Sequence, residues 1–387
     1  MNVLFLALDI LLDTPRGDAI HVRELARSLA ERGNHIDLVT ATPPGLARFL
    51  GDGVDHHTRP NGSDLAVVRF CAKLAERAAV DVVYERRLSP KVAFGTSLLA
   101  RVPFVVEVNG VEEEAELQGR ISRTPLRPLK ARIRRRMYGR AESVVTVSSR
   151  LAQVVRARGD LSPDKIFVVP NGVNLGRFVP KDRYAVRTTI GIPPAHWIVY
   201  VGNLVRWQGV ENLIRAMPLI ASSDSLVRLL IVGDGPLRQK LADLARRTKV
   251  EAKVSFVGSI PHESVPDYIG SADVCVAPFA RERNEAIGLS PLKVYEYMAC
   301  GRPIVASRVS GISELFEASE AGLLVPPDDP PSLASAILRI LESPADAHEM
   351  GVRGRLYAER QCSWAKTAEQ VEHVLQGAIQ NHRGAHR

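Results

Sequence analysis

The residues best suited to chemistry gather in one run of the sequence, SPLKVYEYMACG, at residues 290–301. Ser290 and Pro291 are types that a helix N-terminus favours, and the free N–H groups and positive dipole end of a first helical turn bind anions such as a diphosphate. Lys293 follows inside the expected helix, and Glu296 lies nearly two turns in. The run therefore indicates a site for a phosphorylated ligand with hydroxyl groups. The alternative is an ordinary helix with Lys293 and Glu296 on its surface.

Short apolar runs alternate with longer amphipathic runs along the chain, a pattern typical of parallel sheets with crossover helices. In the first half we expect a helix at about residues 19–32 and strands at 3–8, 35–40, 80–84, 103–108, 143–147 and 165–169. A second series restarts near residue 197, with strands at 198–201, 228–232, 254–257, 274–278, 303–306 and 322–325. Its main helices are expected at 210–217, 236–247, 264–269, 291–298 and 331–341, and a last helix at 364–380. The sequence thus predicts an α/β protein with two doubly wound, Rossmann-like domains, because 387 residues suit two cores better than one.

The domain boundary is expected in residues 171–194, which contain several Gly and Pro. We therefore assign residues 1–180 to the first domain and 181–363 to the second, and treat residues 364–387 as a C-terminal helix. Such α/β domains bind ligands at the carboxyl ends of their strands, here in a cleft between the two domains.

The composition favours a cytoplasmic protein without a spanning segment. No apolar run approaches the roughly 20 residues that a transmembrane helix needs. The N-terminal MNVLFLALDI lacks a basic region and carries Asp9 within its apolar stretch, so we expect a buried strand rather than a signal peptide.

Cysteine and histidine positions give no metal-site pattern. The four cysteines, Cys71, Cys275, Cys300 and Cys362, are scattered without a C-x-x-C pair, which is typical of reduced core thiols. The adjacent pair His56 and His57 is expected in a polar loop. We therefore expect no metal ligands and no metal cofactor.

The net charge of +8 is unevenly distributed, with nine Lys or Arg and no Asp or Glu between Arg120 and Arg140. This stretch is a candidate for an anionic membrane surface, with a solvated helix face as the alternative. No nucleic-acid-binding module accompanies it, so a nucleic-acid partner is not expected. The turn Gly233-Asp-Gly-Pro is an incomplete dinucleotide fingerprint and does not by itself indicate a nucleotide.

The run SPLKVYEYMACGRPIVAS resembles the donor-site segment of family 4 glycosyltransferases, in a branch marked by SPLK. Further pieces resemble the family in the same order: RGDAIHVRELARSLAERGNHIDLVT, VVTVSSRL, VPNGVNLGRF, YVGNLVRWQGVENLI, LLIVGDGPLRQKL, VSFVGSIPHESVPDYIGSADVCVAPF and GLLVPPDDP. The resemblance spans nearly the whole chain. It implies the GT-B fold, with the C-terminal helix returning to the first domain, and retaining transfer from a nucleotide sugar without a metal.

The resemblance also assigns residue roles. Glu296 corresponds to the glutamate that binds the ribose, and Gly17 to a glycine that lies against the donor diphosphate. The remaining positions implied at the nucleotide-sugar site are Gly202, Asn203, Gly233, Gly258, Ile260, Ser290, Pro291 and Leu292.

The chain departs from the family pattern near the transferred sugar and the diphosphate. Gly288 stands where a sugar-facing glutamate is usual, and Glu285 is a possible substitute. Asn203 and Gln208 replace an Arg and a Lys that usually grip the diphosphate. A cation is still needed there, because the departing diphosphate gains negative charge, and the candidates are Arg206 and Lys293.

A third departure is Asn109, where many relatives have a His at a strand end facing the sugar. Asn109 cannot be a general base but can orient sugar hydroxyls. The neighbouring Glu107 and the acidic run Glu112–Glu114 are either acceptor ligands or a solvated helix start.

The sequence therefore predicts a retaining transferase that moves a hexosyl-type sugar from a nucleotide sugar, with UDP as the favoured base, to an acceptor hydroxyl. The acceptor is a carbohydrate, a lipid-linked glycan or a small molecule. The alternatives are a GT-B hydrolase or epimerase of nucleotide sugars and a catalytically idle binding subunit. We expect the enzyme to be cytoplasmic. If Arg120–Arg140 bind lipid, it would be a peripheral protein on the inner face of the membrane. The sequence does not indicate an oligomeric state.

Overall fold

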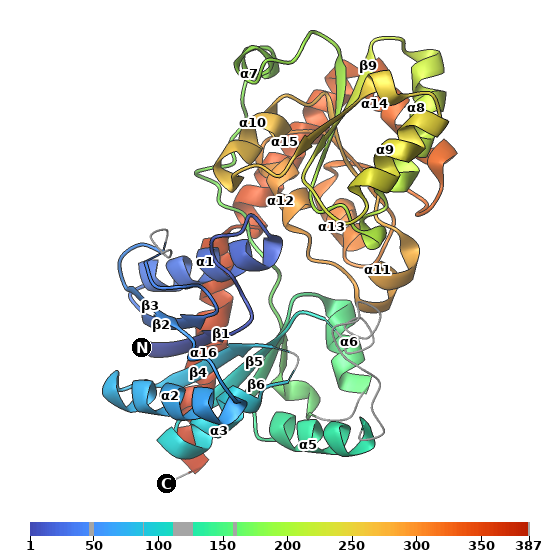
Figure 1. Cartoon of the computed structure of the whole chain (residues 1–387). Coiled ribbons are helices and arrows are strands. Elements are labelled where there is room, and N and C mark those ends of the chain that lie inside the picture. Colours follow the sequence, from blue (N-terminus) through green and yellow to red (C-terminus); the bar gives the residue numbers. More distant parts are fainter. Residues whose placement is uncertain (46–49, 88, 111–126, 158–160, 386–387) are drawn as a thin grey trace. The chain divides into compact units, whose positions relative to one another are not determined.

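The chain forms two compact units, which we describe from a computed structural model (Figure 1). The structure describes residues 1–45, 50–87, 89–110, 127–157 and 161–385. The acidic run Glu112–Glu114 and the part of the basic stretch before residue 127 lie outside these ranges. Unit 1 comprises Met1–Asn171 and Trp364–Arg387, and unit 2 comprises Gly172–Ser363.

Unit 1 is built on a seven-stranded parallel sheet of order β3-β2-β1-β4-β5-β6-β7. Its strands are β1 (Asn2–Ala7), β2 (His35–Thr40), β3 (Val54–Thr58), β4 (Val82–Arg86), β5 (Phe104–Val108), β6 (Ser143–Thr146) and β7 (Ile166–Val168). Its helices are α1 (Gly17–Glu31), α2 (Asp64–Arg77), α3 (Lys91–Ala100), α5 (Arg127–Gly139), α6 (Ser149–Ala157) and α16 (Trp364–Ala385), with a short 3-10 turn η1 (Pro163–Lys165). The central strands read as continuous apolar runs because helices cover both faces of a parallel sheet.

Unit 2 is built on a six-stranded parallel sheet of order β10-β9-β8-β11-β12-β13. Its strands are β8 (His196–Val201), β9 (Val227–Val232), β10 (Val254–Gly258), β11 (Val274–Ala277), β12 (Ile304–Ser307) and β13 (Gly322–Val325). Its helices are α7 (Arg183–Thr189), α8 (Val210–Ser223), α9 (Arg238–Arg247), α10 (Val265–Gly270), α11 (Arg281–Ile287), α12 (Leu292–Ala299), α13 (Ile312–Ser319), α14 (Pro330–Glu342) and α15 (Pro344–Gln361). Three 3-10 turns, η2 (Arg206–Gln208), η3 (Glu251–Lys253) and η4 (His262–Ser264), complete it.

In each sheet the strand order reverses between two neighbouring strands, which form the topological switch point. In unit 1 this switch lies between β1 and β4, and in unit 2 it lies between β8 and β11. Open parallel α/β sheets bind ligands at the carboxyl ends of the strands flanking such a switch. In unit 2 that place is formed by the residues that follow Val201 and Ala277.

The boundary between the two units lies between Asn171 and Gly172, earlier in the sequence than the expected boundary after residue 180. Val173 donates its N–H to the carbonyl of Cys362, and Phe178 is buried in the core of unit 2. The expected linker also contains α7, which Asp182 caps through the N–H groups of Tyr184 and Ala185. Residues 172–180 therefore belong to unit 2, because burial of their apolar side chains fixes them there.

The C-terminal helix α16 packs within unit 1 against α1, β4, β5 and β6 (Figure 1). Val371 and Leu375 are buried in this contact. Glu372 accepts hydrogen bonds from the side chains of Arg32 and Asn34, at 2.7 Å each. The chain thus returns to its first unit after completing the second.

Two expectations about local structure have different outcomes. His56 and His57 do not form a polar loop but lie in the edge strand β3, because each pairs with a residue of β2. An edge strand is only half covered, so its polar composition resembles that of a loop. All four cysteines are free and buried, as expected. Within the described residues, no helix combines the length and apolarity needed to cross a membrane.

Candidate active site

The candidate site lies in unit 2 around the N-terminus of α12. The helix begins at Leu292, and its N-cap residue Pro291 makes no side-chain cap hydrogen bond within the described part of the chain. Arg355 of α15 donates to the carbonyl of Ala299 at 2.7 Å, which fixes the other end of the helix. A cation at a helix C-terminus and an open N-terminus are the arrangement expected of an anion-binding helix.

Lys293 directs its ammonium group toward the carboxyl end of β8. Its Nζ donates to the hydroxyl of Tyr200 at 3.0 Å and to Oε1 of Gln208 at 2.6 Å. It also lies 4.1 Å from the centroid of the Tyr200 ring, a cation–π contact. Burial lowers the pKa of Lys293 to about 7, and Glu296 opposes that shift only in part.

Gly202 makes room for this lysine. A Cβ at Gly202 would lie 2.6 Å from Nζ of Lys293, and the backbone there has φ of +143°. Tyr200, whose pKa burial raises, donates its hydroxyl proton to the carbonyl of Asn203 at 2.9 Å and accepts from Lys293. Lys293 has three N–H groups, and within the described residues two of them have acceptors, so one is left for a ligand.

Glu296 lies one turn further along α12 and is held by a histidine that sequence reasoning missed. Nε2 of His262 lies 2.8 Å from Oε1 of Glu296, and both side chains are buried. The guanidinium of Arg177 donates to Nδ1 of His262 at 3.0 Å. Because arginine is only a donor, Nδ1 is the acceptor and Nε2 carries the proton that is donated to Glu296. This chain of contacts fixes the orientation of the carboxylate.

Three glycines allow the backbone segments at the carboxyl ends of β8, β9 and β10 to approach one another closely. A Cβ on Gly233 would lie 2.1 Å from the carbonyl oxygen of Gly202. The N–H of Gly233 donates to the carbonyl of Gly258 at 2.8 Å. Ile260, two residues further on, packs half-buried against the core. The structure thus brings Gly202, Gly233 and Gly258 together, at the edge of the sheet where Lys293 lies.

The other candidate cation is placed differently. Arg206 lies in η2 with its side chain 86% exposed, and its ion-pair partner Glu282 is 3.7 Å away and equally exposed. Asn203 is exposed in the same loop. The structure therefore brings Lys293, but not Arg206, to the buried end of β8.

The sugar-facing candidates lie on α11 and directly after it. Glu285 is half-buried on α11, and Gly288 is the residue after that helix, with φ of +66°. The hydroxyl of Ser290 lies 3.2 Å from that of Tyr295. Gly288 supplies no side chain, so Glu285 stays the candidate carboxylate for the sugar, while Glu282 of the same helix is 82% exposed.

The remaining candidates belong to unit 1. Gly17 is the exposed first residue of α1. Asn109 follows β5 and donates from Nδ2 to Oε1 of Glu107 at 2.6 Å. Its amide is thereby oriented, with Oδ1 as the acceptor that remains.

Glu107 is buried on β5 and is not a solvated helix residue. It accepts from the hydroxyl of Tyr84 at 2.7 Å and forms an ion pair with Nε2 of His21 at 2.9 Å, while Nε of Arg86 lies 3.5 Å away. Burial alone would raise its pKa, but His21, Arg86 and the Tyr84 hydrogen bond outweigh burial and lower the pKa of Glu107 to about 2. Glu107 is therefore an ionised centre that holds its neighbours in place.

Comparison with known proteins gives family matches in both units. The family model described as "Glycosyltransferase Family 4" matches residues 15–177, and the model "Glycosyl transferases group 1" matches residues 195–343. A D-inositol 3-phosphate glycosyltransferase of Acidothermus cellulolyticus is 30% identical over 414 aligned positions, covering 95% of this chain and 88% of that protein. An uncharacterized glycosyltransferase of Methanocaldococcus jannaschii is 27% identical over 383 positions, covering 94% and 95%.

A solved structure extends the likeness to the fold. The Anabaena protein HepE, in complex with UDP-glucose, superimposes with a TM-score of 0.78 at 19% identity, covering 97% of this chain and 99% of that one. Two Rossmann-like units with this topology and these relatives define the class as a glycosyltransferase with the GT-B fold. The chain belongs to glycosyltransferase family 4.

Proposed function

We propose that this glycosyltransferase binds a nucleotide diphosphate sugar in unit 2 and moves the sugar, of hexosyl type, to an acceptor hydroxyl with retention of configuration. The observation that carries the proposal is Lys293, whose ammonium lies at the switch point of the sheet beside Gly202 and has, among the described residues, acceptors for two of its three N–H groups. A cation there offsets the charge that develops on the departing diphosphate. The open first turn of α12 would supply N–H groups to the same phosphates.

The nucleoside would be held by Glu296 and the backbone of Gly233, Gly258 and Ile260. A buried carboxylate whose Oε1 already accepts from His262 has Oε2 to offer to ribose hydroxyls. Charge-assisted hydrogen bonds of this kind are stronger than neutral ones. We take UDP as the favoured base and GDP as its competitor.

The transfer step needs neither a metal nor a histidine base in this proposal. Lys293 supplies positive charge at the diphosphate. In front-face substitution the bond from the anomeric carbon to the diphosphate oxygen breaks on the face where the acceptor oxygen attacks. The departing phosphate oxygen takes the acceptor's proton, so Asn109 is required only to orient hydroxyls.

The acceptor would bind to unit 1, and the transfer would serve the biosynthesis of a glycan, a glycolipid or a natural product. In α5, Arg132, Ile133, Arg135 and Arg136 are exposed, so an apolar side chain stands among three cations. Such a surface suits anionic lipid, with roughly 1 kcal/mol expected for each basic residue near the membrane. Vesicle cosedimentation tests this: binding should rise with the anionic lipid fraction and fall in Arg132→Glu/Arg136→Glu, and equal weak binding to neutral and anionic vesicles would remove the lipid from the proposal.

A nucleotide-release assay tests the proposed function. Purified protein is incubated with UDP- or GDP-sugars, with and without acceptor candidates that include inositol phosphates and lipid extracts, in EDTA. Acceptor-dependent release and a product of unchanged anomeric configuration by NMR are expected. Release without any acceptor product would favour a hydrolase, and no release with any donor would contradict the proposal.

A further inference from the structure

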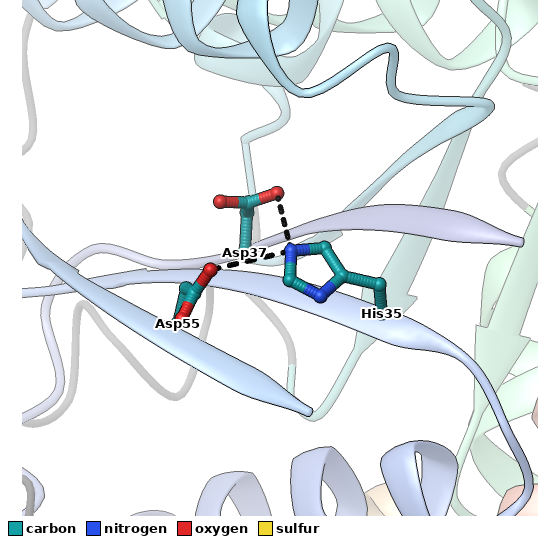
Figure 2. Close-up of side chains that lie close together, drawn as sticks. All are labelled: His35, Asp37 and Asp55. Atoms are coloured by element: carbon teal, nitrogen blue, oxygen red, sulfur yellow. Dashed lines mark ion pairs between the residues drawn. The ribbon is translucent and has the colours of Figure 1, made fainter. Parts of the chain in front are cut away.

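A second polar cluster lies in unit 1, at the amino ends of β2 and β3 (Figure 2). The two strands pair in parallel with Asp37 opposite Asp55. Side chains two residues apart on a strand share a face, so His35 and Asp37 of β2 lie on the same side as Asp55 and His57 of β3. Figure 2 shows the imidazole of His35 reaching both carboxylates.

One carboxylate of this cluster is incompletely satisfied. Asp37 is only 2% exposed, and its Oδ1 accepts from Nε2 of His57 at 2.8 Å. Its Oδ2 is buried and has no hydrogen-bond partner within the described residues. A buried carboxylate oxygen without a donor is costly, and two carboxylates directly opposite each other on paired strands repel.

His35 lies at ion-pair distance from both carboxylates, and these distances also suit ligands of one metal ion. Nε2 of His35 lies 3.6 Å from Oδ2 of Asp37 and 3.4 Å from Oδ2 of Asp55. All three atoms lie within 4.8 Å of one another. Two ligand atoms about 2.0–2.2 Å from a tetrahedral Zn²⁺ are about 3.3–3.6 Å apart. The two distances from His35 therefore match a tetrahedral zinc shell, and the two carboxylate oxygens, within 4.8 Å of each other, are close enough to share one ion.

We propose that Nε2 of His35, Oδ2 of Asp37 and Oδ2 of Asp55 bind a divalent transition-metal ion, with Zn²⁺ as the best match. One imidazole and two carboxylates favour zinc over Mg²⁺ and Ca²⁺, which prefer all-oxygen shells of higher coordination number. His57 orients Asp37 through the other carboxylate oxygen, as outer partners of metal ligands commonly do. Water completes the shell on the exposed side, where Asp55 is 67% exposed.

The expectation of no metal ligands rested on spacing along the sequence, and the ligands here come from two strands. The site lies at the amino edge of the sheet, whereas Asn109 lies at its carboxyl edge. The ion would therefore act structurally, by tying the edge strand β3 to β2. Removal of the site should leave glycosyl transfer in saturating donor within about twofold of the parent.

Calorimetric titration of the full chain, stripped with EDTA, tests the site. The parent protein should bind one Zn²⁺ saturably and show no heat with Mg²⁺. His35→Ala at a half-buried position and Asp55→Asn at an exposed position should weaken zinc binding at least tenfold, and Asp52→Asn should match the parent. Absence of saturable zinc binding by the parent, or unchanged binding by both variants, would overturn the proposal.

Thermal unfolding gives an independent readout that does not depend on transfer activity. Zinc should raise the unfolding midpoint of the parent and of Asp52→Asn, because an ion that binds only the folded state stabilises it. The midpoint of His35→Ala without zinc reports whether that variant folds normally. An equal zinc-induced rise in parent and His35→Ala would contradict the assignment.

Discussion

Nζ of Lys293 lies 2.6 Å from Oε1 of Gln208, so the candidate cation of α12 is hydrogen-bonded to the residue that stands where the family resemblance implies a lysine. Where a lysine is usual in the loop after β8, this chain has Gln208. A lysine from α12 reaches the same loop and is held there by that glutamine. In the proposed function, Lys293 supplies the cation at the carboxyl end of β8 in place of that lysine.

The first prediction concerns the charge on Lys293. Lys293→Met keeps most of the apolar stem and removes the ammonium group, so kcat should fall about 10²–10³-fold, as for loss of one transition-state-stabilising donor. Steady-state nucleotide release measures it. The matched control is Lys240→Met, which removes an exposed lysine of α9 and should stay within about twofold. A kcat for Lys293→Met near that of the parent would contradict this role of Lys293. Arg206 would then be the next cation to test.

The second prediction concerns pH. Because the pKa of Lys293 is about 7, its ammonium is partly neutral in the free protein at that pH. A bound diphosphate favours the charged form and raises the pKa, so binding takes up a proton. The affinity for UDP should fall as pH rises above about 7, by up to roughly tenfold per pH unit until the pKa of the complex is reached. Calorimetry between pH 6 and 9 measures it, and an equal slope in Lys293→Met would show that another group titrates.

The third prediction concerns stability without ligand. The unfolded chain keeps Lys293 protonated up to its ordinary pKa of 10.5, whereas the folded protein releases that proton near pH 7. Between these values the unfolded state binds more protons, so stability rises with pH in that window. Lys293→Met removes the burial cost and should stabilise the ligand-free protein at pH 7 by about 0.5–2 kcal/mol, a gain often seen when functional residues are replaced. Urea unfolding measures it, and a marked loss of stability would contradict this account.

The fourth prediction concerns Glu296 and its partner His262. If Glu296 binds ribose hydroxyls, Glu296→Ala should weaken UDP binding about 10–100-fold, in line with 1.5–3 kcal/mol for hydrogen bonds to a charged group. The parent should bind 2′-deoxy-UDP more weakly than UDP, and the variant should bind both alike. His262→Ala should raise the KM for the donor more than it lowers kcat, because it acts through Glu296. Retained discrimination in Glu296→Ala would place the ribose elsewhere.

The fifth prediction concerns Gly202. A methyl group there would meet Nζ of Lys293 at 2.6 Å, so Gly202→Ala should displace the lysine and lower kcat about tenfold or more. Gly377→Ala, in α16, has no atom within 4 Å of the new Cβ and is the control, which should be neutral or slightly stabilising. Equal activity of the two variants would contradict the positioning of Lys293 by Gly202.

Much of the fold could be predicted because parallel strands are buried on both faces and read as apolar runs. All six strands expected in unit 2 are present, and so are the six expected in unit 1. The edge strand β3 was missed, since its VDHHT sequence is half exposed and lacks the apolar alternation of a covered strand. The boundary was placed too late because Gly and Pro mark turns and say nothing about which core Phe178 enters.

The part of the site that lies in one local motif could be predicted from the sequence. The part that depends on tertiary contacts could not. The helix start at residue 292 and the roles proposed for Lys293 and Glu296 come from one continuous run. His262 was missed because it meets Glu296 only through the fold, 34 residues away in sequence. The His35, Asp37 and Asp55 cluster was missed for the same reason, since strand pairing and not spacing brings it together.

The most direct test of Lys293 as the cation at the diphosphate is a crystal structure of the protein with a bound nucleotide diphosphate. We expect the diphosphate within hydrogen-bond distance of Nζ of Lys293 and of the first-turn N–H groups of α12, with ribose hydroxyls on Glu296. A diphosphate held by Arg206, with Lys293 still bound only to Tyr200 and Gln208, would contradict it.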